Sequence, residues 1–181
     1  MPHTIEYAAS GRAKCRGCGE KIAKGELRFG ERLPNAFGDG EMTLWFHVRC
    51  GAFKRPEPFL EFLADDEWGD VAEDDREGAK ALQASAEDGM NHRRLPRVDG
   101  ASRAPTGRAR CRSCKELIEK GSWRIGLTFF EDYGFQPAGF IHAGCAAAYF
   151  ETTALFDRLK HFTPSLSAAD MLALEADIGL S

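Results

Sequence analysis

Eight residues of the sequence have the types and the spacing that suit a metal ion. A Cys-x-x-Cys pair at Cys15 and Cys18 is followed, after 28 intervening residues, by His47-Val-Arg-Cys50. Three thiolates and one imidazole are the donors of a closed tetrahedral zinc site. A second set follows 96 residues later, with 27 residues between its halves: Cys111, Cys114, His142 and Cys145. The sequence therefore predicts two zinc ions per chain.

The cysteine count favours metal ions over disulfide bonds. All six cysteines of the 181-residue chain belong to these two boxes, three to each. Three disulfides would also use six cysteines, but the N-terminal sequence MPHTIEYAASGRAK lacks the apolar core of a secretory signal peptide. No stretch has the roughly 18 apolar residues of a membrane span. We therefore expect a reducing intracellular compartment, the cytoplasm or nucleoid of a bacterium or the nucleus of a eukaryote, and no membrane partner.

The predicted zinc ions have no open coordination position. Four protein ligands per ion leave no place for a reactive water, so the zinc should be structural and not catalytic. The sequence also shows no nucleophile motif and no phosphate-binding loop. Both observations predict that the chain is not an enzyme.

The repeated box predicts an α+β fold of two tandem zinc-centred modules, each a short antiparallel sheet plus helices around a Cys3His site. We place the modules at residues 1–90 and 91–181. After each Cys-x-x-Cys knuckle, a Lys-Gly turn precedes an alternating run, Leu27-Arg28-Phe29 in the first module and Trp123-Arg124-Ile125 in the second. Such alternation is typical of a half-buried strand, and it predicts that each arginine points outward.

Two turn-rich stretches, residues 34–42 and 131–137, are expected to connect these strands to the second half of each box. Short apolar strands then deliver His47 and His142, and the second ligand pair opens a helix. Residues 89–100 have the composition of a linker between the modules. Near the C-terminus, Ser167 and Asp170 have the spacing of a capping box, which predicts a helix that ends near Gly179.

The net charge of −4 hides a strong segregation of charge along the chain. Residues 1–55 carry 10 Lys and Arg against 6 Asp and Glu, whereas residues 56–90 carry 2 against 12. Residues 91–126 carry 10 against 3, and residues 127–181 carry 2 against 7. The zinc boxes therefore lie in basic segments that acidic segments follow, and the local field matters more than the sum.

The residues around the boxes resemble the PARP-type zinc finger, which occurs in poly(ADP-ribose) polymerases and in a eukaryotic DNA ligase. The resemblance is carried by Tyr7-Ala-x-Ser10-Gly11-Arg12-Ala13-x-Cys15-x-x-Cys18, by Gly25-x-x-Arg28 and by Trp45-Phe46-His47-x-x-Cys50. It covers residues 1–60 well and residues 103–150 with more differences. In the second copy Phe140-Ile141 replaces the Trp-Phe pair, Arg103 replaces Tyr7, and the turn is one residue shorter.

The resemblance implies contacts with DNA. In this family the arginine of the Gly-Arg motif and the strand arginine contact DNA, and apolar residues of the turn stack on a base exposed at a strand end or nick. Guanidinium groups suit phosphates, and an apolar side chain that caps an unstacked base contributes about 1–3 kcal/mol. Such contacts recognise shape and not sequence. The positions implied here are Arg12, Arg28, Phe37, Met42, Arg108, Arg124, Tyr133 and Phe135.

These observations predict a non-enzymatic, zinc-dependent DNA-binding protein that recognises strand breaks or exposed duplex ends. Two fingers fill the 181 residues and leave no room for the transferase domain of a poly(ADP-ribose) polymerase. The acidic segments at residues 61–77 and 151–177 are candidate docking surfaces for a DNA-repair enzyme. The alternative is a zinc-stabilised protein-interaction module that does not bind DNA and whose acidic segments contact a basic partner.

Overall fold

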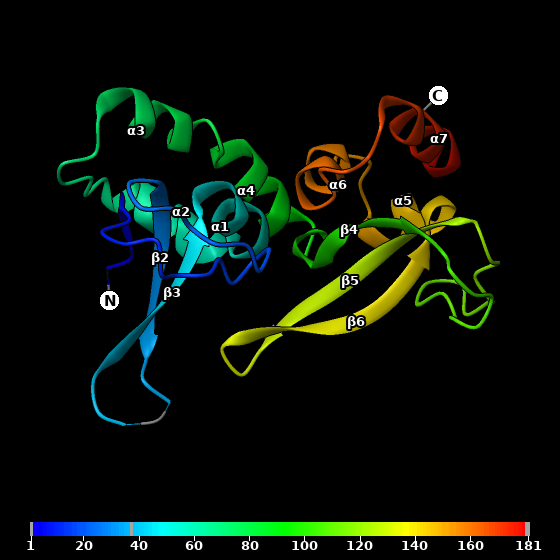
Figure 1. Ribbon diagram of the computed structural model, residues 1–181, viewed down its shortest axis with the longest axis horizontal. Helices are drawn as coiled ribbons and strands as arrows, with labels where there is room; N and C mark the ends of the chain where they lie inside the picture. The colour runs from blue at the N-terminus through cyan, green and yellow to red at the C-terminus, as the bar shows by residue number, and fades with distance from the viewer. Residues whose placement is uncertain (1, 37, 180–181) are drawn as a thin grey trace. The chain divides into compact units, whose positions relative to one another are not determined.

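The computed structural model describes residues 2–36 and 38–179 and divides into two compact units, residues 1–91 and 92–181 (Figure 1). Each unit contains a three-stranded antiparallel sheet and several helices. The prediction of an α+β fold with two small sheets is therefore confirmed. Within the described residues, no helix is both long enough and apolar enough to cross a membrane.

The first sheet has the strand order β1-β2-β3, with every neighbouring pair antiparallel. Phe29 of β2 lies opposite Ile5 of β1 and Phe46 of β3, and all three side chains are buried. This row of apolar side chains faces the helices, as the alternating sequence predicts. The strands are β1 (Thr4–Tyr7), β2 (Leu27–Pro34) and β3 (Glu41–His47).

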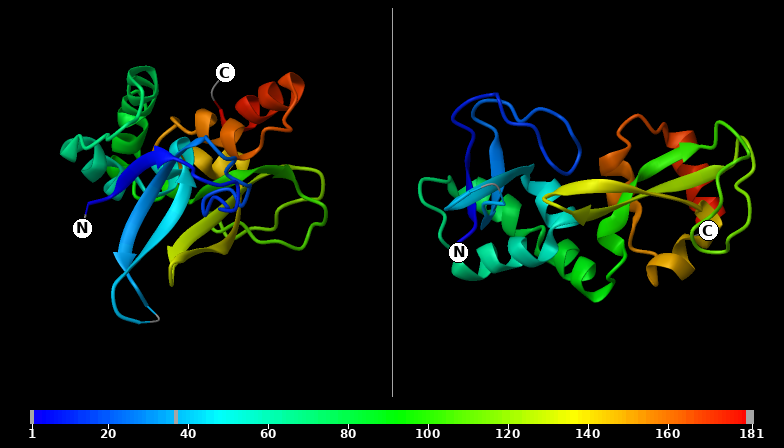
Figure 2. Two further views of the ribbon diagram at one scale, coloured as in Figure 1. Left: turned by 60° about the vertical axis from the view of Figure 1, so that its left-hand side comes forward. Right: turned by 90° about the horizontal axis from the view of Figure 1, so that it is seen from below.

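Four helices follow the first sheet: α1 (Val48–Lys54), α2 (Pro56–Asp65), α3 (Glu73–Lys80) and α4 (Gln83–Asn91). Seen from below, the helices of this unit lie along one side of its strands (Figure 2, right). Phe59 of α2 meets Phe29 edge to face, with ring centroids 5.5 Å apart. Phe62 packs in the same way against Trp68, which lies beyond the end of α2. These contacts close the core of the first unit.

The second unit repeats the arrangement with the strand order β4-β5-β6, and its helices again lie on one side of the sheet (Figures 1 and 2). Its strands are β4 (Val98–Arg103), β5 (Trp123–Glu131) and β6 (Gly134–His142). Its helical elements are η1 (Leu95–Arg97), η2 (Ala143–Cys145), α5 (Ala146–Phe150), α6 (Phe156–Phe162) and α7 (Ala168–Ile178).

The helix α7 begins and ends where the sequence predicts. The hydroxyl of Ser167 accepts a hydrogen bond from the backbone N–H of Asp170, and the carboxylate of Asp170 accepts one from the backbone N–H of Ser167. At the other end, Gly179 adopts a left-handed conformation with φ of 84°. The predicted capping box and the stop near Gly179 are confirmed.

The segment predicted to be a linker, residues 89–100, is ordered and belongs mostly to the second unit. It contains the end of α4, the short helix η1 and the first residues of β4. Leu95 and Val98 are buried in the core of the second unit. The boundary between the two units, after residue 91, falls inside the predicted linker, but the rest of the segment packs on the second unit because two apolar residues decide the packing.

Candidate zinc centres and their surroundings

The first four predicted ligands meet at one point between β3, α1 and the knuckle. Their donor atoms lie within 4.8 Å of one another. The Nδ1 atom of His47 is 3.3 Å from the Sγ atom of Cys18 and 3.9 Å from that of Cys50. In a tetrahedron with Zn–S bonds of about 2.3 Å and Zn–N bonds of about 2.0 Å, nitrogen and sulfur are about 3.5 Å apart. The group therefore fits zinc, with Nδ1 as the histidine donor.

The second four predicted ligands form the same group. The Nδ1 atom of His142 is 3.4 Å from the sulfur of Cys114 and 3.8 Å from that of Cys145, and the donors again lie within 4.8 Å. All six cysteines are free of disulfide bonds. The structure thus holds two Cys3His zinc-binding groups, and the prediction of two zinc ions per chain is confirmed.

Each histidine ring is oriented by a contact to its other nitrogen. The Nε2 atom of His47 lies 3.6 Å from a carboxylate oxygen of Glu26, and that of His142 lies 3.1 Å from the carbonyl oxygen of Leu117. A donor hydrogen on Nε2 leaves Nδ1 free to bind a metal. The backbone N–H groups of His47 and His142 also point at Cys15 and Cys111, at 3.3 Å from each sulfur.

The thiols of each group lie so close together that ionisation of all three favours a bound cation. Hydrogen bonding from Cys18 holds the pKa of Cys15 at about 3, whereas hydrogen bonding to Cys15 raises the pKa of Cys50. In the second group, burial raises the pKa of Cys111, but backbone hydrogen bonds outweigh it and bring the value to about 6. Burial also raises the pKa of Cys145 to about 12. Bound zinc, a dication, would allow all three thiols of a group to ionise together.

Two of the four predicted DNA-contacting arginines are exposed. Arg12 and Arg108 both lie between the first strand of their sheet and the Cys-x-x-Cys knuckle, Arg12 within a turn. In the part of the chain that the structure describes, neither makes an ion pair with a carboxylate. Both guanidinium groups are therefore open to an external anion.

Contrary to the prediction that it points outward into solvent, Arg28 is only 9% exposed. It lies on the opposite face of β2 from the buried Phe29, but its guanidinium stacks on Trp45, 3.5 Å from the ring centroid. It also donates a hydrogen bond of 2.6 Å to the carboxylate of Glu6, its neighbour on β1. The alternation of β2 predicted the face correctly but not the two cross-strand neighbours that cover it.

Arg124 occupies the equivalent place in the second unit with a different partner. Its guanidinium stacks on Phe140 at 3.6 Å and donates to the hydroxyl of Ser102 at 3.1 Å. Ser102 pairs with Arg124 as Glu6 pairs with Arg28, so a neutral hydroxyl replaces a carboxylate. Burial lowers the pKa of Arg124, and its charge is not neutralised by Ser102.

The predicted turn residues fall into three classes. Phe37 lies outside the described residues. Met42 is a half-buried residue of β3 opposite Leu33. Tyr133 is at the tip of the second hairpin, where it and Asp132 both have positive φ, at 63° and 49°. Two such residues form the tight turn that joins antiparallel strands.

Phe135 is a strand residue and not a turn residue. The hairpin turn is only two residues long, so β6 begins at Gly134 and Phe135 lies opposite Phe130, with ring centroids 5.2 Å apart. The prediction of a turn over residues 131–137 was wrong because Asp132 and Tyr133 alone supply the left-handed conformations that reverse the chain. The aromatic pair on the two strands extends the hairpin instead.

Comparison with known proteins identifies the first unit. Residues 6–89 match the family profile described as the poly(ADP-ribose) polymerase and DNA-ligase zinc-finger region. Residues 6–89 are a zinc finger of the PARP type. This PARP-type finger contains the first Cys3His group and all four helices of the first unit except the last residues of α4.

The similarity to individual relatives extends beyond the first finger. The chain is 30% identical over 164 residues to a poly(ADP-ribose) polymerase of Sarcophaga peregrina, which covers 81% of this chain and 16% of the relative. It is 31% identical over 134 residues to poly(ADP-ribose) polymerase 1 of Gallus gallus, covering 68% and 13%. It is also 26% identical over 165 residues to the polynucleotide 3′-phosphatase ZDP of Arabidopsis thaliana, covering 80% and 24%. The chain spans less than a quarter of the length of each of these relatives.

Sequence patterns did not predict the partners of the strand arginines. Glu6 and Ser102 set the charge state of the two strand faces, and only the register of β1 with β2 and of β4 with β5 reveals them. No sequence pattern predicted a strand at Glu6 or Ser102, and alternation within a strand does not by itself indicate register.

Proposed function

We propose that the two units bind DNA in a zinc-dependent manner, recognise strand breaks or exposed duplex ends without sequence specificity, and do not act on the DNA chemically. The observation that carries this proposal is an exposed arginine before each Cys3His group, Arg12 in the first unit and Arg108 in the second, neither of which forms an ion pair with a described carboxylate. The family description names poly(ADP-ribose) polymerase and DNA ligase, and one relative is named a polynucleotide phosphatase. These names support a nucleic-acid ligand.

The geometry of the arginines supports binding to the phosphate backbone. Arg12 and Arg108 are exposed, and Arg124 carries a charge that its hydroxyl partner does not cancel. Guanidinium groups bind phosphate oxygens in a fork geometry and stay charged at any physiological pH. Contacts of this kind are independent of sequence.

Break recognition requires a group that replaces a missing base neighbour. Tyr133 at the tip of the second hairpin is suited to that role, and so is the half-buried Met42 near the start of β3. An aromatic or apolar side chain at such a tip can stack on an unpaired base for about 1–3 kcal/mol. Intact duplex offers no such base face, which is the basis of the proposed selectivity.

The decisive experiment is a binding titration with nicked, gapped, blunt-ended and intact circular duplex at several salt concentrations. Three to four phosphate contacts predict that log affinity falls with log salt at a slope of roughly −3 to −4. Arg12→Ala with Arg108→Ala should make the slope shallower by about 2. A matched control, Lys80→Ala with Lys160→Ala, removes two positive charges from the acidic segments and should leave the slope unchanged. Equal affinity for nicked and intact duplex would refute break recognition.

The acidic segments favour a second role alongside DNA binding. Helix α3 begins with the exposed residues Glu73, Asp74 and Asp75, and the segment 56–90 carries 12 Asp and Glu against 2 Lys and Arg. Such a surface suits a basic partner, for example a DNA-repair enzyme recruited to the break. If the chain bound a basic protein surface but no form of DNA, the protein-interaction function would replace the proposed one.

A further inference from the structure

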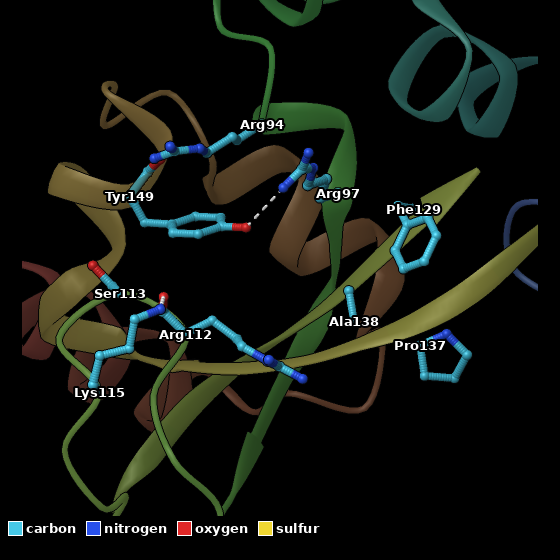
Figure 3. A pocket seen from close by; sticks show the side chains of 9 residues that line it. All are labelled: Arg94, Arg97, Arg112, Ser113, Lys115, Phe129, Pro137, Ala138 and Tyr149. Carbon is cyan, nitrogen blue, oxygen red and sulfur yellow. Dashed lines mark hydrogen bonds between the residues drawn. The ribbon is translucent and has the colours of Figure 1, made fainter. Parts of the chain in front are cut away.

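The second unit contains a basic pocket that neither the zinc group nor the predicted DNA-contacting residues explain. It has a volume of about 630 Å³ and is lined by Arg94 and Arg97 on one side and by Arg112 on the other (Figure 3). Lys115 and the ring of Tyr149 complete the basic end of the pocket. A volume between about 300 and 1,000 Å³ is typical of small-ligand sites.

The charge of the pocket is positive and uncompensated. Four cationic side chains line it, all four belong to exposed residues, and no carboxylate is among the lining residues. Among residues 2–36 and 38–179, none of the four cations forms an ion pair with Asp or Glu. Like charges that line one pocket without a counter-charge repel one another, so an anion bound in the pocket is stabilised.

Three of the four cations, Arg94, Arg97 and Lys115, donate hydrogen bonds to neutral acceptors. Arg97 donates to the hydroxyl of Tyr149 at 3.2 Å, which Figure 3 shows as a dashed line, and Arg94 donates to the carbonyl oxygen of Tyr149 at 3.1 Å. The ammonium group of Lys115 donates to the carbonyl oxygen of Arg112 at 2.7 Å. These bonds orient the side chains and leave other donor hydrogens of each cation free.

The residues at the equivalent positions of the first unit differ. Its knuckle carries Gly19 where the second unit has Lys115, and Lys54 follows Cys50 at the spacing at which Tyr149 follows Cys145. Lys115 has φ of 69°, a left-handed conformation that suits the glycine of the first unit and strains a residue with a side chain. The second unit thus has a lysine at the pocket although the backbone conformation at that position is strained.

An apolar rim lies beside the four cations. Phe129 of β5 and Pro137 of β6 are exposed and line the opposite end of the pocket from Lys115 (Figure 3). An apolar edge next to a cluster of guanidinium groups suits a ligand in which a phosphate is attached to a sugar and a base.

We infer that this pocket binds a terminal phosphate of a nucleotide, with the adjoining sugar or base against Phe129 and Pro137. A terminal phosphate carries a charge of about −1.5 to −2 at pH 7, against −1 for a phosphodiester within a strand, so a pocket lined by four cations favours the terminal group. The ligand is either the phosphorylated end of a broken DNA strand, which rests on the proposed function, or a free nucleotide.

The first test uses AMP as the probe and needs no DNA. Titration of the zinc-loaded chain with AMP, followed by NMR, should shift the Nε–H signals of Arg97 and Arg112 and the ring signals of Tyr149. Adenosine without phosphate should not. Arg97→Ala with Arg112→Ala should abolish the shifts of Tyr149, whereas the control Arg93→Ala with Arg110→Ala removes two neighbouring charges outside the pocket and should retain them.

A second variant separates binding from folding. Lys115→Gly restores the glycine that the first unit has at this position, so it relieves the left-handed strain and should not lower the melting temperature. It should still weaken AMP binding by several-fold, because one charge-assisted contact is lost. A stable Lys115→Gly protein with unchanged AMP affinity would contradict the inference, and so would the absence of any shift in the pocket.

The second test identifies the source of the phosphate. Nicked duplexes that differ only in bearing a terminal phosphate or a hydroxyl at the nick should differ in affinity by about tenfold, the effect of one to two charge-assisted hydrogen bonds. The Arg97, Arg112 variant should lose this difference and the Arg93, Arg110 control should keep it. AMP binding without discrimination between the two nicks would assign the pocket to a free nucleotide. AMP binding without any DNA binding would refute the proposed function and leave the phosphate site standing.

Discussion

The two strand arginines show how a single neighbour changes what a residue can do. Arg28 and Arg124 occupy the same position of equivalent strands, and each stacks on an aromatic ring of the third strand. Arg28 is paired with Glu6, whereas Arg124 meets the hydroxyl of Ser102. A phosphate must displace the carboxylate from Arg28 before it binds, but Arg124 has no such competitor. We therefore expect the second unit to use its strand arginine more effectively.

Exchanging the two neighbours tests this difference. Glu6→Ser should tighten binding to nicked duplex by about two- to fivefold, because it removes a competing negative charge beside Arg28. Ser102→Glu should weaken binding by a similar factor by introducing that charge beside Arg124. Fluorescence anisotropy at fixed low salt measures both changes. Glu57→Ser, which removes an exposed carboxylate on α2, serves as the charge control.

The effect of each exchange on affinity should be compared with its effect on the melting temperature. The Glu6 carboxylate is 44% exposed but its partner Arg28 is only 9% exposed, so Glu6→Ser should lower the melting temperature, with the serine hydroxyl recovering part of the lost bond as Ser102 does for Arg124. If Glu6→Ser left the affinity unchanged while the fold was intact, Arg28 would not contact DNA in this protein.

At the scale of elements, the two units hold their sheets to their helices by different means. In the first unit Glu31 of β2, only 1% exposed, accepts two hydrogen bonds of 2.7 and 2.5 Å from Arg55 between α1 and α2. The positions that match by sequence spacing in the second unit are Leu127 and Phe150, both buried in its core. The same junction is ionic in one unit and apolar in the other.

This difference predicts a strongly non-additive pair of substitutions. Glu31→Leu alone should destabilise the first unit by about 3–5 kcal/mol, because the charge of Arg55 loses its buried partner. Glu31→Leu with Arg55→Phe copies the second unit and should recover most of that loss. Chemical denaturation of the zinc-loaded proteins measures all members of the cycle. Additive losses would mean that the two side chains do not act as a pair.

At the scale of the whole molecule, each unit has its own core and its own zinc group. Among the described residues, the core of the second unit is formed by side chains between Leu95 and Ile178. Each unit is small, and binding of a structural zinc contributes about 10–16 kcal/mol of apparent free energy that is also folding energy. Loss of one ion should therefore unfold one unit and not both.

Zinc removal tests the independence of the two units. Elemental analysis should give two zinc ions per chain, and Cys18→Ser should reduce the number to one. The resonances of the second unit should stay dispersed in that variant, while those of the first unit collapse. Cys114→Ser should have the reverse effect, and a chelator should unfold both units in the unsubstituted chain. Two zinc ions in the Cys18→Ser protein would contradict the assigned ligand set.

Local sequence patterns predicted the features that depend on residues close together in the chain. The spacing of thiols and imidazoles identified both zinc groups, because metal ligation accepts few donor types and distances. Alternation identified the strands that carry Arg28 and Arg124, and the capping box identified the start of α7. The match to the PARP-type finger follows from the same spacing.

Only the tertiary structure decided which charges remain available. Strand register placed Glu6 on Arg28 and Ser102 on Arg124, and a two-residue turn moved Phe135 from a predicted loop into a strand. The folding of residues 92–98 onto the second unit brought Arg94 and Arg97 to the same pocket as Arg112. Pairing, burial and convergence of charge depend on residues that are distant in the sequence, and local patterns contain no information about which distant residues will meet.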